Sequence, residues 1–139
     1  MSERVFLAVA GASGAISAAI DAAASHLLAS DPYRAALAVA AARYGLIHAA
    51  ALLGLAVLVA RSPSLWACIA GWLFVAGLAL FCGGLDLVAL GAPGGLTVLA
   101  PFGGTAFILG WIALLVAALR PRPTPKFSAH GSRSTSSAR

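Results

Sequence analysis

Four long apolar stretches follow one another along this chain, separated by short polar segments. They cover approximately residues 5–28, 36–60, 65–90 and 95–119, and each is close to the ~20 residues that a helix needs to cross a bilayer. The segments between them carry residues typical of helix starts and turns: SDPYR at 30–34, RSPSLW at 61–66 and GAPGG at 91–95. The pattern predicts four transmembrane helices.

The connections between these helices are short, which makes consecutive helices antiparallel neighbours. We therefore predict an all-α membrane protein, with a four-helix antiparallel bundle over residues 1–119. Composition agrees, because 61% of the residues are hydrophobic and 9% are charged, which leaves too little polar surface for a water-soluble globule. The first stretch resembles a secretory signal at its start, but its apolar run is too long for one, and we interpret it as a retained helix.

The basic residues predict the orientation of the bundle. The net charge is +5, and residues 120–139 contain five bases and no acid. The positive-inside rule favours both termini in the cytoplasm. In that orientation only Arg34 lies outside the membrane. The bases on the cytoplasmic side are then Arg4, Arg61, Arg120, Arg122, Lys126, Arg133 and Arg139. The tail at 120–139 is rich in Pro and Ser, and we expect a disordered basic segment facing anionic headgroups rather than a nucleic acid.

Polar residues inside the spans are the candidate functional residues, because a charge at the bilayer centre costs about 3 kcal/mol or more. Ser13, Ser17, Asp21 and Ser25 form a stripe at a spacing of four in the first helix. At ~1.5 Å rise per residue, Asp21, Arg43 and Asp86 all lie in the outer half of the membrane. We predict that Arg43 pairs with one carboxylate, and that the other is protonated or reached by water.

Two interpretations of this polar cluster stay open. In the first, Asp21, Arg43 and Asp86 hold helices together, and the serines allow close packing and hydrogen bonds across the bundle. In the second, the same residues line a polar cavity for a proton, an ion or a small ligand.

No arrangement typical of an enzyme, a metal site or a cofactor is present in the sequence. Asp21 and His26 are five residues apart, so they do not share a helix face. His26 and His48 lie at different depths, which argues against a haem held by both. Cys68 and Cys82 are fourteen residues apart within one predicted helix and are expected to be small buried residues.

Several stretches resemble the DUF423 family, also called UPF0382, of small bacterial membrane proteins. This family is similar to proteins of the transmembrane protein 256 kind. They are GASGAISAAIDAAASHLL, RYGLIHAAALL, AGWLFVAGLALFCGGLDLVAL and LAPFGGTAFILGWIALLVAAL. The resemblance implies an inner-membrane location and no known activity. The positions that match the family pattern are His26, Tyr44, His48, Pro101, Gly103, Gly104, Gly110 and Trp111.

Two residues depart from the family pattern. Asp21 replaces a small residue, and Asp86 stands where a Tyr is usual, so both departures introduce a carboxylate near the depth of Arg43. Pro101 lies six residues into the fourth stretch, where it either kinks the helix or marks a late helix start.

The leading hypothesis is a non-enzymatic structural or accessory component of a membrane complex, with a membrane-protein partner or a second copy packed on its small-residue surfaces. The alternative is a small oligomeric transporter or channel that uses the region of Asp21, Arg43 and Asp86.

Overall fold

The computed structural model describes residues 2–120, and apart from short connections this part of the chain is helical. Four spans are long and apolar enough to cross a membrane: Ser2–His26, Pro32–Arg61, Leu65–Ala89 and Gly94–Leu119. The prediction of an all-α protein with four membrane-spanning helices is confirmed. The predicted tail at 121–139 lies outside the described residues.

Two of the spans are single α-helices and two are composite. The first span is α1 (Ser2–His26) and the second is α2 (Pro32–Arg61). The third joins α3 (Leu65–Gly77), the π-helix η1 (Leu78–Cys82) and α4 (Gly83–Ala89). The fourth joins the 3-10 helix η2 (Gly94–Leu99) and α5 (Ala100–Leu119).

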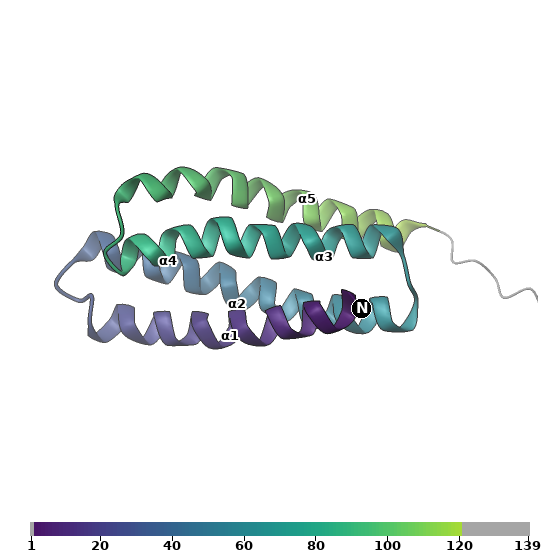
Figure 1. Cartoon of the computed structure of the whole chain (residues 1–139), viewed down its shortest axis with the longest axis horizontal. Coiled ribbons are helices and arrows are strands. Elements are labelled where there is room, and N and C mark those ends of the chain that lie inside the picture. Colours follow the sequence, from purple (N-terminus) through teal and green to yellow (C-terminus); the bar gives the residue numbers. More distant parts are fainter. Residues whose placement is uncertain (1, 121–139) are drawn as a thin grey trace, which may run out of the picture.

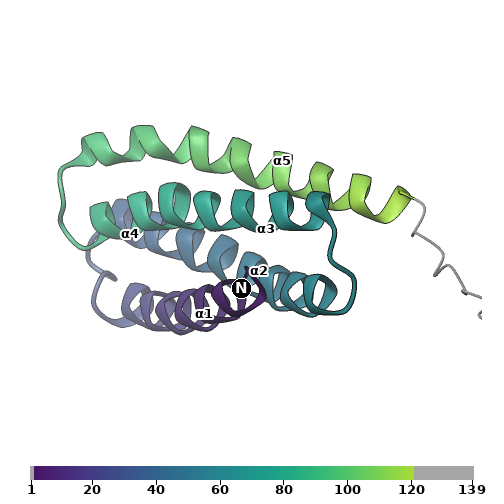
Figure 2. The same cartoon turned by 45° about the vertical axis from the view of Figure 1, so that its right-hand side comes forward.

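The spans run up, down, up and down, with α1 beside α2 and α5 against α3 (Figure 1). In both views α5 lies on the opposite side of the bundle from α1 (Figure 2). The start of α1, the connection from α2 to α3 and the end of α5 share one end of the bundle. That end carries Arg4, Arg61 and Arg120.

The opposite end is tied by the residues that start α2. The Asp31 carboxylate accepts a hydrogen bond from the backbone N–H of Arg34 (3.1 Å), and Pro32 occupies the first turn, where its missing N–H costs nothing. The Arg34 side chain then donates from Nε to the backbone oxygen of Ala89 (2.6 Å). This bond links the start of α2 to the end of α4. Next to it, Gly91 has a φ of 109°, which allows the chain to turn toward η2.

Pro101 lies in the first turn of α5, after the 3-10 helix η2. Of the two outcomes open from the sequence, a kink or a late helix start, the structure has the late start. A proline in the first turn removes no intrahelical hydrogen bond, so α5 begins without strain at this residue.

Glycines allow the helices of the bundle to approach closely. Three phenylalanine rings lie over a glycine of a neighbouring element: Phe6 over Gly71, Phe74 over Gly110 and Phe107 over Gly77. A Cβ on any of these glycines would overlap the ring, and a Cβ on Gly103 would overlap the backbone and Cβ of Phe81. In lipid, helices associate mainly by such close van der Waals packing, so these contacts are a main source of stability.

Candidate functional site

His48 is the most enclosed polar side chain in the middle of the bundle, with 3% of its surface exposed. Its Nδ1 lies 2.8 Å from the backbone oxygen of Tyr44, one turn earlier in α2. Its Nε2 lies 3.2 Å from Nε1 of Trp111 on α5. The indole N–H can only donate, so Nε2 accepts and Nδ1 carries the proton that is donated to Tyr44. Both ring nitrogens of His48 are therefore satisfied inside the protein.

Aromatic rings surround this histidine. Phe107 stacks on the imidazole with 3.6 Å between ring centroids, and Phe74 meets it edge-on at 5.2 Å. Tyr44 and Trp111 complete the group, and Trp111 also packs against Phe74 at 5.1 Å. With both nitrogens bonded, one ring stacked on it and another edge-on, His48 serves packing and helix register, because no lone pair is left for a ligand.

Most of the residues that matched the family pattern meet at this interface between α2, α3 and α5. Tyr44 and His48 come from α2, and Trp111 reaches them from α5. Pro101 lies in the first turn of α5, Gly103 allows the close approach of the Phe81 backbone, and Gly110 allows that of the Phe74 ring. Gly104 lies beside Phe81 as well, with 3.9 Å from an added Cβ to that ring. His26 is separate from this group, since it is exposed at the end of α1.

The polar stripe of α1 divides among three surroundings. Ser17 is buried, and its hydroxyl lies against Gly45 of α2. Ser13 lines a groove toward the third span, and Asp21 is exposed. Ser25 bonds within its own helix, donating to the backbone oxygen of Asp21 (3.2 Å). A spacing of four residues advances by about 40° at each step, so the stripe winds around α1 and does not stay on one face.

The predicted ion pair of Arg43 is absent from the described residues. Within residues 2–120, Arg43 has no carboxylate within 4.0 Å, and its side chain is exposed. The reason lies in the helix geometry: Gly45 faces α1, and a residue two positions earlier points about 160° away from it. We predicted similar depths for Asp21, Arg43 and Asp86. However, α2 is rotated so that the Arg43 side chain points away from the bundle.

Asp86 is the second polar group of interest, and it lies in α4 directly after the π-helix η1. Its Oδ1 is buried and has no hydrogen-bond partner within residues 2–120. The carboxyl lines a groove of about 290 Å³ between α1 and the third span, together with Ser13, Ser17 and Cys82. A π-helix turn shifts the register of the residues that follow it, and such turns are frequent at functional sites. The groove combines a carboxyl, two hydroxyls and a thiol with apolar walls.

The sequence did not indicate this groove, because its polar residues belong to two spans and η1 changes their register. It also did not indicate the bond between Trp111 and His48. The only available signal was that both residues belong to stretches resembling the same family.

Comparison with known proteins places these features in a family. The model of a family described as "Protein of unknown function (DUF423)" matches residues 20–104, more than half of the chain. The chain belongs to the DUF423 family. It is 32% identical to the UPF0382 inner membrane protein YgdD of Escherichia coli over 122 residues, which cover 86% of this chain and 93% of YgdD.

Two further DUF423 relatives align over shorter regions. The UPF0382 membrane protein YwdK of Bacillus subtilis is 43% identical over 37% of this chain and 42% of its own length. A UPF0382 membrane protein of Staphylococcus aureus is 36% identical over 58% of this chain and 65% of its own length. No solved structure matches the chain. The protein is therefore a membrane protein of a family whose names state no activity.

Proposed function

We propose that this DUF423 protein is a non-enzymatic accessory component of a membrane complex. The face of α2 that points away from the bundle binds the partner. Its expected location is a bacterial inner membrane, with both termini in the cytoplasm. The observation that carries the proposal is the position of Arg43, which is exposed on a membrane-spanning helix and has no ion-pair partner within residues 2–120.

The depth of Arg43 makes this exposure costly. Arg43 lies eleven residues after Pro32, about 16 Å along a helix of about 45 Å. An arginine on a lipid-facing surface at such a depth costs about 3 kcal/mol. A carboxylate or another acceptor on a neighbouring helix lowers that cost, and intramembrane charges commonly pair across helices in this way.

The surface around Arg43 also suits helix packing. Ala50 lies two turns later on the same face of α2 and is exposed. Gly54 is exposed as well, and no atom of another residue lies within 4 Å of an added Cβ. Small residues beside a charge let a partner backbone come close enough for a direct hydrogen bond to the guanidinium.

The experiment combines copurification in mild detergent with site-specific crosslinking. Tagged full-length protein is expected to retain one stoichiometric heteromeric membrane partner. Arg43→Leu is expected to lose it and still to purify as a folded monomer, because Arg43 makes no hydrogen bond or ion pair within residues 2–120. A photoreactive residue in place of Ala50 is expected to crosslink to that partner, and one in place of Ile112, on the exposed face of α5, is not.

Arg34→Leu and Arg43→Lys are the matched controls. Arg34→Leu removes the bond to Ala89 at the end of the bundle, so it lowers stability and leaves the α2 surface unchanged. Arg43→Lys keeps the charge and is expected to keep part of the binding. Unchanged partner recovery with Arg43→Leu contradicts the proposal.

The alternative function is a small oligomeric transporter or channel, and the groove at Asp86 supports it. A buried carboxyl oxygen without a hydrogen bond, in a groove that also contains hydroxyls, suits a proton or a small cation. Asp21 and Arg43 lie outside this groove, so the alternative rests on Asp86. Copurification separates the two functions, since a self-oligomer without a heteromeric partner and with a water-accessible groove favours transport.

A further inference from the structure

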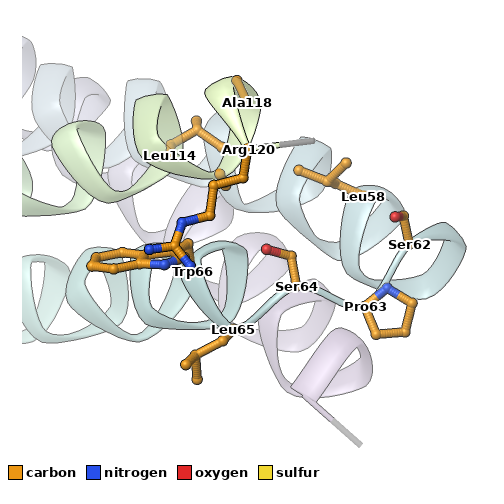
Figure 3. A pocket seen from close by; sticks show the side chains of 10 residues that line it. Leu58, Ser62, Pro63, Ser64, Leu65, Trp66, Leu114, Ala118 and Arg120 are labelled. Atoms are coloured by element: carbon orange, nitrogen blue, oxygen red, sulfur yellow. The ribbon is translucent and has the colours of Figure 1, made fainter. Parts of the chain in front are cut away.

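A second cavity lies at the end of the bundle where α2 ends, α3 begins and α5 ends. It has a volume of about 570 Å³ and is lined by residues from all three helices and from the connection between α2 and α3 (Figure 3). One part of its lining is apolar, with Leu58 from α2 and Leu114 from α5. The other part carries Ser62, Ser64 and Arg120.

Arg120 is held at this cavity by Trp66. The guanidinium carbon lies 5.1 Å from the centroid of the indole ring, which is a cation–π contact. Figure 3 shows the side chain reaching from the end of α5 onto Trp66, with the Ser64 hydroxyl turned toward the same space. Within residues 2–120, Arg120 has no carboxylate within 4.0 Å. The guanidinium is therefore oriented and its charge is not neutralised by this part of the chain.

The start of α3 adds further donors to the cavity. Ser64 is the N-cap residue of α3, but its hydroxyl makes no capping hydrogen bond. The first N–H groups of a helix have no partner inside the helix, and the helix dipole makes this end favourable for an anion. Ser64 and the first two residues of α3, Leu65 and Trp66, line the cavity. The oriented guanidinium and these donors thus meet at one cavity.

We propose that this cavity binds the phosphate of an anionic membrane phospholipid. Arg120 and the start of α3 bind the phosphate, and the acyl chains lie along Leu58 and Leu114. The position fits such a ligand, because the cavity lies at the ends of three spans, where Trp and Arg meet the headgroup layer. A planar guanidinium also matches a phosphate with two parallel hydrogen bonds. This site is separate from the partner surface around Arg43.

The test titrates full-length protein in detergent with dioctanoyl phosphatidylglycerol and counts bound lipid by native mass spectrometry. Wild-type protein is expected to bind one lipid, and Arg120→Gln is expected to weaken binding about tenfold or more, as for a lost hydrogen bond to a charged group. Arg61→Gln is the matched control, because Arg61 ends α2 at the same end of the bundle and is not in the cavity lining. It is expected to bind as wild type does.

Two further probes separate the sources of binding. Dioctanoylglycerol has the same acyl chains and no phosphate, and equal binding of it overturns the proposal, since only the apolar wall is then used. Inorganic phosphate is the second probe. Binding of free phosphate that depends on Arg120 and is as tight as binding of the lipid overturns the assignment to a phospholipid. Equal weakening by Arg61→Gln also overturns it, because it indicates general attraction to positive charge.

Discussion

His48 and Asp86 are both polar side chains within membrane-spanning segments, but their surroundings differ. Both nitrogens of His48 have hydrogen-bond partners, and rings from α3 and α5 enclose it. Asp86 lines a groove and has a buried oxygen that accepts no hydrogen bond from the part of the chain that the structure describes. From the sequence we expected His48 to match the DUF423 pattern and Asp86 to depart from it. From this contrast we expect the bonded and enclosed His48 to contribute to the stability of the fold, and the Asp86 carboxyl to contribute little.

The largest effect is expected where the backbone of Phe81 meets Gly103. In Gly103→Ala the added Cβ overlaps the backbone of Phe81, which cannot move without shifting η1. We expect the free energy of unfolding to fall by ~1–3 kcal/mol, measured by reversible unfolding in mixed micelles.

Gly54→Ala is the matched control, because an added Cβ there meets no atom within 4 Å. Higher helix propensity is expected to stabilise this variant by up to ~1 kcal/mol. Equal effects of the two substitutions contradict the close approach of α5 to the third span.

An intermediate effect is expected for the hydrogen bond between Trp111 and His48. His48→Phe keeps a ring in the cluster but leaves the indole N–H without an acceptor, at an expected cost of ~1–3 kcal/mol. A double-mutant cycle with Trp111→Phe measures the pair, and we expect a coupling of ~0.6–1.7 kcal/mol, as for hydrogen bonds between membrane helices. Strictly additive losses indicate that the bond contributes nothing to the fold.

The smallest effect is expected at Asp86. Asp86→Leu removes a buried oxygen that has no partner, so the free energy of unfolding is expected to stay unchanged or to rise by up to ~1 kcal/mol. Reversible unfolding of the protein in mixed micelles measures this free energy, and Asp86→Asn is the polar control. A loss as large as that of His48→Phe contradicts the comparison, because it shows that the fold depends on the Asp86 carboxyl.

The four spans, their antiparallel order and the family could be predicted from the amino-acid sequence alone. Length and hydropathy suffice for these features, because a backbone in lipid must satisfy its own hydrogen bonds and forms helices. The start of α2 at Asp31 and Pro32 was also readable, since capping depends on neighbouring residues.

Which polar groups meet became visible only in the folded bundle. Depth along a helix follows from residue number, but the direction of a side chain depends on how each helix is rotated and on shifts such as the one at η1. Arg43 therefore shares a level with Asp21 and Asp86 and still points outward, while Trp111 reaches His48 from 63 residues away. Rotation is set by packing, here by rings that lie over glycines, and that packing is a property of the assembled bundle.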